Sequence, residues 1–250
     1  MAYFDYQGKK IYYRIDGKGA PCLFLHGNTA SSTMFDFLLP LYSEAFQVIR
    51  MDFLGNGRSE RVARFPDDLW QEQGRQVVAL CEALDLHGVH LVGTSGGAYA
   101  AINAALMQPA LFGKVVADSF DGETLAPGFA DALLQERAAA KTDESARGFY
   151  EWNQGADWER VVDQDTDALV RLAKSDAPLF CAPIASIQLP LLITVSRDDA
   201  MLGNDMEKEC HALSVRSPYV HYTIYDSGAH PLILSQAEVL AGRIKAFLES

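Results

Sequence analysis

The sequence has few cysteines, and their positions give no sign of a metal or disulfide framework. The 250 residues contain four of them: Cys22, Cys81, Cys181 and Cys210. None lies at the short spacing of a zinc site, and four thiols in a chain of this length do not make a disulfide scaffold. The sequence therefore predicts packing roles for these thiols and no metal site.

Basic residues are also scarce. The chain has 21 Lys and Arg against 33 Asp and Glu, a formal net charge of -12. Such a surface repels nucleic-acid phosphates and anionic lipid headgroups. We therefore expect neither a nucleic-acid nor a membrane partner.

No hydrophobic run suits a membrane span or a secretory signal. The longest uncharged stretch, Leu91 to Gly113, is interrupted by several glycines and by Pro109, which indicates a buried strand, a tight turn and a buried helix. The N-terminus carries Asp5 and has no apolar run after a basic start. These features favour a cytoplasmic location.

The apolar residues that are present follow the pattern of an α/β protein. Residues 3–6 and 9–15 read as two antiparallel strands. Six further short apolar runs, most of them separated by helix-length segments, are residues 22–25, 46–51, 89–93, 114–117, 191–195 and 219–225. The alternation predicts a mostly parallel, eight-stranded sheet with helices on both faces.

One segment, residues 121–180, departs from this alternation. It has helical patches, no convincing strand, and 13 acidic against 6 basic residues. It also holds four large aromatics: Phe149, Tyr150, Trp152 and Trp158. We expect a helical insertion over the sheet, whose aromatics form either its own small core or the roof of a substrate pocket.

A further helix is expected at the C-terminus. One apolar stripe is formed by Ala237, Leu240, Ile244, Phe247 and Leu248. Ser235 and Glu238 have the spacing of a capping box at its start. This helix would follow directly on a loop that carries His230.

The clearest chemical signal is Gly93-Thr94-Ser95-Gly96-Gly97, a G-x-S-x-G pattern between a predicted strand and a predicted helix. A sharp strand-to-helix turn needs glycines beside the serine, because the backbone is strained and the flanking segments approach closely. Such a turn exposes the Ser95 hydroxyl at the carboxyl end of the sheet. It also directs the first N–H groups of the helix at that point, which suits a developing oxyanion.

These residues resemble the α/β-hydrolase superfamily. The resemblance is carried by His26-Gly27-Asn28, the 52–59 stretch DFLGNGRS, the Ser95 turn, the 190–199 stretch PLLITVSRDD and Gly228-Ala229-His230. Two departures are Ser196 and Ala229, which stand where the superfamily usually has glycine. The resemblance implies a hydrolase core of residues 1–120 and 185–250 and a small helical cap of residues 121–184.

The resemblance also implies a catalytic triad of Ser95, Asp199 and His230, in the chain order expected of this fold. Counting the superfamily's G-x-x-D spacing from Ser196 favours Asp199 over Asp198. Asp118, after the strand at 114–117, is a third candidate for the acid.

His230 has few competitors as the base. The other histidines, His87, His90, His211 and His221, lie in predicted surface or packing positions. For His26 we expect a hydrogen bond that supports the loop at Asn28.

The predicted chemistry is acyl transfer from a small-molecule substrate to water. His230 would take the proton of Ser95, Asp199 would orient the imidazole, and the N–H groups of Asn28 and Gly96 would hold the oxyanion. A serine nucleophile favours a carboxylic-ester hydrolase with no metal or organic cofactor over the superfamily's dehalogenase and epoxide hydrolase chemistries. The same residues would also suit other functions: a C–C bond hydrolase, a thioesterase, an aminopeptidase, an acyltransferase, or a ligand receptor without turnover.

Overall fold

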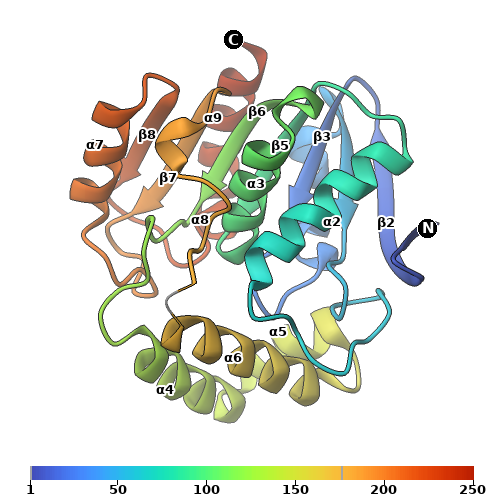
Figure 1. The fold of residues 1–250 in the computed structure, drawn as a ribbon, viewed down its shortest axis with the longest axis vertical. Helices are drawn as coiled ribbons and strands as arrows, with labels where there is room; N and C mark the ends of the chain where they lie inside the picture. Colours follow the sequence, from blue (N-terminus) through green and yellow to red (C-terminus); the bar gives the residue numbers. More distant parts are fainter. Residues whose placement is uncertain (1, 176) are drawn as a thin grey trace.

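The computed structural model describes residues 2–175 and 177–250, and its centre is one sheet of eight strands (Figure 1). In chain order the strands are β1 (Ala2–Tyr6), β2 (Lys9–Gly17), β3 (Ala20–Leu25), β4 (Phe46–Met51), β5 (Val89–Thr94), β6 (Phe112–Asp118), β7 (Leu191–Ser196) and β8 (Val220–Tyr225). Their spatial order is β1-β2-β4-β3-β5-β6-β7-β8. The pairs β1/β2 and β2/β4 are antiparallel and the rest are parallel, which confirms the predicted fold.

Alternate side chains of the central strands point to opposite faces of the sheet, and each face is buried in its own apolar cluster. Leu23 and Leu25 of β3 belong to one apolar cluster, and Cys22 and Phe24 belong to the other. The first cluster packs under α2 (Leu69–Ala83), α3 (Gly96–Met107) and α7 (Met206–Arg216). The second packs under η1 (Ser32–Leu38), α1 (Leu39–Tyr42), α8 (Leu232–Ser235) and α9 (Ala237–Glu249). Short 3-10 turns, η2 (Pro109–Leu111) and η3 (Ile184–Ser186), precede β6 and β7.

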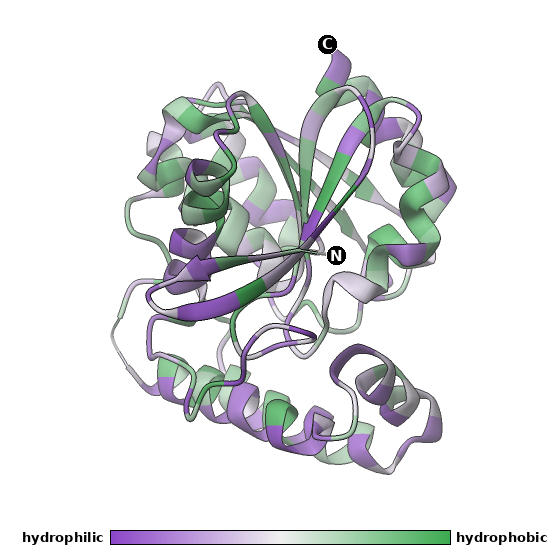
Figure 2. Ribbon diagram, turned by 90° about the vertical axis from the view of Figure 1, so that its right-hand side faces the viewer, coloured by the Kyte–Doolittle hydropathy of each residue, from purple (hydrophilic) through white to green (hydrophobic). Residues whose placement is uncertain are grey.

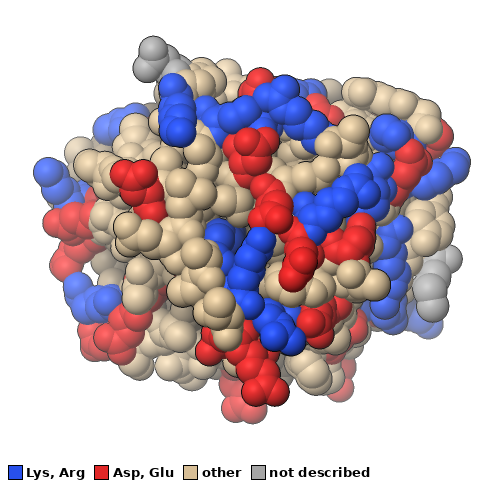
Figure 3. All heavy atoms as spheres, turned by 90° about the horizontal axis from the view of Figure 1, so that it is seen from below, with Lys and Arg blue, Asp and Glu red and all other residues tan. Residues whose placement is uncertain are grey.

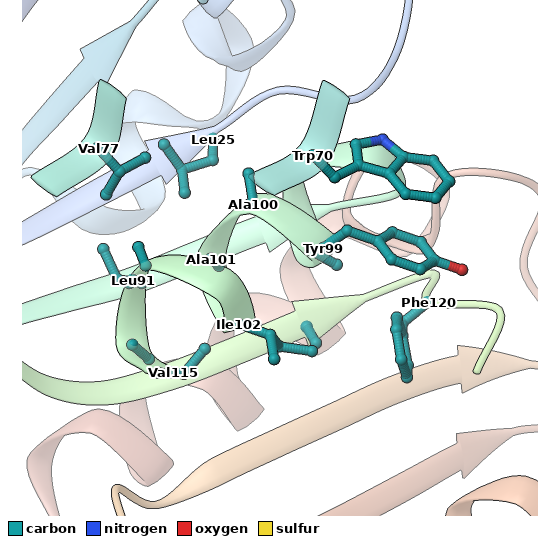
Figure 4. Close-up of a cluster of buried hydrophobic side chains, with 14 of the residues drawn as sticks. Leu25, Trp70, Val77, Leu91, Tyr99, Ala100, Ala101, Ile102, Val115 and Phe120 are labelled. Carbon is teal, nitrogen blue, oxygen red and sulfur yellow. The ribbon is translucent and has the colours of Figure 1, made fainter. Parts of the chain in front are cut away.

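In the uncharged stretch from Leu91 to Gly113, the predicted strand, turn and helix are the end of β5, the following turn and α3. The stretch continues through η2 into the beginning of β6, two residues earlier than the strand predicted at 114–117. The small side chains of α3, with Ala100 and Ala101, let this helix lie close against the sheet (Figure 4). Within residues 2–175 and 177–250, no helix is both long and apolar enough to cross a bilayer.

Three further helices, here called the three-helix segment, come between β6 and β7 in the chain. They are α4 (Phe129–Thr142), α5 (Glu144–Gln154) and α6 (Trp158–Lys174). They lie together below the carboxyl ends of the parallel strands, separate from the helices that cover the sheet faces (Figures 1 and 2). Acidic and basic side chains are interspersed over this side of the molecule (Figure 3). Pairs such as Arg171 with Asp67, at 2.6 Å, join the segment to the rest of the chain.

The predicted capping box before the C-terminal helix is wrong. Gln236 is the N-cap of α9, and no side chain caps its first turn. Ser235 is instead the last residue of the short helix α8, where its backbone is already helical. Its hydroxyl donates a hydrogen bond to the Ala229 carbonyl at 2.6 Å, which holds the loop of His230 rather than the helix start.

Candidate active site

Ser95 occupies the turn between β5 and α3 in a strained backbone conformation. Its φ is 53° and its ψ is -124°, a region that residues with a side chain rarely adopt. A Cβ at Gly93 would lie 2.1 Å from the Gly97 carbonyl oxygen, and a Cβ at Gly97 would lie 2.2 Å from that of Leu25. The two outer glycines are therefore required by close backbone contacts, and the turn projects Ser95 at the carboxyl end of the sheet.

His230 lies between Ser95 and a buried carboxylate. Its Nε2 is 3.0 Å from the Ser95 Oγ, and its Nδ1 is 2.8 Å from the Asp199 Oδ2. The Asp199 side chain is fully buried, whereas that of His230 is 14% exposed. Because the carboxylate accepts from Nδ1–H, the Nε2 that faces Ser95 carries the free lone pair of a neutral imidazole. The three residues follow β5, β7 and β8, which deliver them to one edge of the sheet.

The other two candidate acids do not reach His230. Asp198 is exposed, and its N–H donates to the Ser196 hydroxyl at 3.2 Å. Asp118 is buried and accepts three hydrogen bonds, from the hydroxyls of Thr94 (2.7 Å) and Thr194 (2.9 Å) and from the N–H of Ile233 (3.1 Å). Burial raises the pKa of Asp118 to about 6 despite these bonds. Asp118 thus ties β6 to α8, which follows the His230 loop.

His26 has the supporting position predicted for it. Its Nε2 accepts a hydrogen bond from the Phe53 N–H at 3.0 Å, so its Nδ1–H donates to the Gly27 carbonyl at 2.8 Å. Burial lowers the pKa of His26, which keeps the ring neutral. The ring therefore fixes the start of the loop that carries Asn28.

The Asp52-to-Ser59 stretch holds the other end of the same loop, at Ser32. The two carboxylate oxygens of Asp52 accept from the N–H groups of Ser32 and Arg58, both at 2.7 Å. A Cβ at Gly57 would lie 2.2 Å from the Asp52 Oδ2, so only glycine allows the turn to close on this carboxylate. The motif is therefore structural in this chain.

Asn28 and Gly96 are neighbours beside Ser95. The Asn28 Oδ1 accepts a hydrogen bond from the Trp70 indole at 3.1 Å, and its Nδ2 donates to the Asp165 Oδ2 at 2.6 Å. Gly96 begins α3, where the first N–H groups have no partner within the helix. The Asn28 side chain therefore lies against Gly96, the residue that follows the serine.

Two hollows meet at Ser95 and His230. The outer one has a volume of about 560 Å³ and lies under the three-helix segment, with Phe149 and Tyr150 in its wall. The inner one has a volume of about 80 Å³ and lies against Trp70 and Tyr99, which stack with ring centroids 4.0 Å apart (Figure 4). The serine is therefore open to a large compartment and a small one.

Trp152 and Trp158 are not among the described residues that line either hollow, which corrects their assignment as pocket residues. Trp158 stacks on Tyr150, at 5.6 Å between ring centroids, inside a small apolar cluster of the three-helix segment. Trp152 is 42% exposed and packs against Phe37 of η1. Both rings hold helices in place instead of facing Ser95.

The chain matches the model of the alpha/beta hydrolase family over residues 22–243. It belongs to this family. The alpha/beta hydrolase is 26% identical to a non-heme haloperoxidase of Rhodococcus erythropolis over 97% of each chain. It is also 31% identical to the uncharacterized hydrolase YugF of Bacillus subtilis, in a match that covers 45% of this chain and 42% of YugF. The crystal structure of MGS-M2, an alpha/beta hydrolase enzyme from a Medee basin deep-sea metagenome library, shares the fold with a TM-score of 0.77 and 20% identity, over 100% of this chain and 98% of that one.

Sequence reasoning missed two buried charged residues of this hydrolase, Asp165 and Arg137. Asp165, on α6, is the residue that bonds Asn28, and burial raises its pKa while the nearby Arg137 charge opposes that rise. Arg137, on α4, lines both hollows and has a 9% exposed side chain. A signal for Asp165 was present, since it interrupts the apolar stripe of α6 between Val161 and Ala168.

Across the described residues, no group of three or more His, Cys, Asp or Glu side chains is arranged to hold a metal ion.

Proposed function

We propose that this hydrolase is a serine esterase that cleaves small or medium carboxylic esters through an acyl-enzyme. The observation that carries the proposal is the continuous hydrogen-bonded series from Ser95 Oγ to His230 Nε2 (3.0 Å) and from His230 Nδ1 to Asp199 (2.8 Å). A serine hydroxyl becomes a competent nucleophile when an oriented base removes its proton. Ser95, His230 and Asp199 have the geometry for these three roles.

In the first half of the reaction, the Ser95 oxygen attacks the ester carbonyl while His230 Nε2 takes its proton. The N–H groups of Asn28 and Gly96 stabilise the oxyanion of the tetrahedral intermediate. The intermediate then collapses, the C–O bond to the alcohol breaks, and His230 returns the proton to the leaving oxygen. Asp199 stabilises the imidazolium throughout.

In the second half, a water molecule enters from the outer hollow and replaces the alcohol. His230 takes a proton from this water as it attacks the acyl carbonyl, and the same N–H groups stabilise the second oxyanion. Collapse releases the acid, and the proton returns to Ser95. Both halves use the same residues, so no further group is required.

The sizes of the two hollows support an assignment of the two parts of the substrate. A volume of about 80 Å³ has room for only a few non-hydrogen atoms, whereas about 560 Å³ accepts a drug-sized group. We assign the inner hollow to a short acyl chain and the outer hollow to the alcohol, which also leaves by the open side. The three-helix segment is the cap of the outer hollow.

A fluorophosphonate probe tests the nucleophile directly. Stoichiometric labelling of the wild-type chain at Ser95, absent in Ser95→Ala, is the expected result, and absence of labelling in the folded wild type would favour a ligand receptor. Turnover is then compared across p-nitrophenyl esters, thioesters, amino-acid amides, β-diketones and alternative acyl acceptors. Fastest turnover of a non-ester class would replace the esterase proposal with the corresponding use of the same residues.

A further inference from the structure

The loop at Asn28 is held from the three-helix segment as well as from the sheet. The Ser31 N–H donates to the Asn153 Oδ1 at 2.9 Å, and the Gln154 Nε2 donates to the Ala30 carbonyl at 2.7 Å. Nearest to Ser95, the Asn28 side chain donates to Asp165 at 2.6 Å. Helices α5 and α6 therefore fix consecutive parts of one loop that borders the reactive serine.

The Asn28 amide has only one orientation that satisfies both of its partners. The Trp70 indole N–H can only donate, so the atom facing it must be the amide oxygen. An ionised Asp165 can only accept, so the atom facing it must be the amide nitrogen. Trp70 from α2 and Asp165 from α6 therefore hold this side chain from two sides.

The same side chain lies against Gly96, the second proposed oxyanion donor. A Cβ added at Gly96 would be 1.9 Å from the Asn28 Oδ1. The amide thus occupies the space that any other residue at position 96 would need. The contact joins the Asn28 side chain to the backbone of the residue that follows Ser95.

Asp165 is buried beside a charged side chain of α4. Its residue is 2% exposed, and its Oδ1 lies 3.6 Å from the Arg137 guanidinium of α4. Arg137 also donates to the Tyr150 hydroxyl of α5 at 3.1 Å. The carboxylate that reaches Asn28 is consequently tied to all three helices of the segment.

We propose that Asp165 is a positioning residue for the oxyanion hole: its bond to the Asn28 side chain sets the direction of the Asn28 N–H, so the three-helix segment contributes to the chemical step as well as to substrate choice. The inference rests on the proposed function, in which the N–H of Asn28 stabilises the oxyanion. A donor displaced by a fraction of an ångström loses much of its effect on the transition state but little on ground-state binding.

The test is a double-mutant cycle on p-nitrophenyl acetate turnover, with Asn28→Ala, Asp165→Ala and the double variant. Asn28→Ala keeps the backbone N–H but loses both side-chain bonds. Each single change should lower kcat by about 10- to 100-fold, with KM within a few-fold, because a small misplacement of a catalytic group has an effect of that size. The double variant should be no slower than the slower single variant, since Asp165 acts through Asn28.

Two further measurements separate positioning from a general loss of structure. Asp165→Asn keeps an oxygen that can accept from Asn28 and should recover most of the lost kcat. The Ki of a trifluoromethyl ketone, whose adduct places an oxyanion in the hole, should rise by the same factor as kcat/KM falls. The matched control is Gln164→Ala. Gln164 precedes Asp165 in α6, and its amide donates to the Ala63 carbonyl at 2.7 Å instead of to the loop of Asn28. Its kinetic constants should equal those of the wild type.

Several results would overturn the inference while leaving the esterase proposal intact. The first is that the wild type hydrolyses the ester and Asn28→Ala does so with the same kcat. The second is that the kcat losses of the two single variants multiply in the double variant. The third is that Gln164→Ala loses as much kcat as Asp165→Ala. If Asp165→Ala fails to fold, Asn28→Ala and Asp165→Asn decide the question, because neither leaves Arg137 without a neighbouring oxygen. A folded wild type with no ester turnover and no fluorophosphonate labelling would instead refute the proposed function, and this inference with it.

Discussion

The loops at the strand ends and the three-helix segment differ in how their residues are placed. Ser95, Asp199 and His230 each follow a strand, and the sheet brings them together at one edge. In the three-helix segment, Trp158 packs within its own helices, whereas Asp165 reaches across to the loop of Asn28. Positions at strand ends follow from local turns, but the direction of a helix face depends on where the helix docks.

The largest effect is expected from Ser95→Ala, which tests the site formed by Ser95, Asp199 and His230 at the strand ends. Ester turnover should fall by at least about three orders of magnitude, because only oxyanion stabilisation and binding remain. Steady-state kinetics and a thermal melt of the same preparation check this result. Substantial activity in a folded, uncontaminated variant would contradict the assignment of Ser95.

A smaller loss is expected when the buried carboxylate is changed. Asp199→Asn should lower kcat by about two orders of magnitude or more, because the amide cannot hold the same imidazole tautomer. Asp198→Asn should have little effect, since Asp198 is exposed and does not contact His230. Kinetics of both variants at equal folded fraction provide the comparison, and a larger loss in Asp198→Asn would refute the choice of Asp199.

The sequence was sufficient to predict the strands and the turn at Ser95, because both depend on residues close together in the chain. The superfamily's spacing selected Asp199, and this is the carboxylate that contacts His230. Ser196 ends β7 in place of the superfamily's usual glycine, and the loop after it still brings Asp199 to His230. The wall of the outer hollow was only half predicted: Phe149 and Tyr150 line it and the two tryptophans do not. The aromatic content of a helical segment does not reveal which rings its own packing will use.

The two tryptophans offer a direct test of that packing. Trp158→Ala should lower the free energy of unfolding by about 3 kcal/mol or more, because it removes a buried ring stacked on Tyr150. Trp152→Ala should cost much less, since this ring is 42% exposed. Urea denaturation measures both. Equal destabilisation, or a change in acyl-chain preference without loss of stability, would contradict this distinction.

Asp118 offers a test through pH. Its pKa of about 6 lies above the usual value for aspartate, so the folded protein binds a proton more tightly than the unfolded chain. Its contribution to stability is present below about pH 4 and is lost as the pH rises through 6. As the pH rises across this range, the unfolding free energy of the wild type should therefore fall relative to that of Asp118→Asn by on the order of 2–3 kcal/mol. Urea denaturation of both proteins at several pH values measures this difference. A difference that does not change with pH would show that burial does not raise the pKa of Asp118.

The smallest expected effect concerns the inner hollow, where the two regions meet. Leu169 of α6 lines this hollow, whereas Leu172 of the same helix is equally buried but lines a different pocket. Leu169→Ala enlarges the space beside Ser95 and should raise the ratio of kcat/KM for hexanoyl over acetyl esters by about 10-fold, as expected for a few methylenes in an apolar pocket. Leu172→Ala should lose comparable stability without this change in ratio. A chain-length series of acyl groups, run beside a series of alcohols on acetate, separates the two compartments. If Leu169→Ala changed the preference for the alcohol instead, the assignment of acyl group and alcohol to the two hollows would have to be reversed.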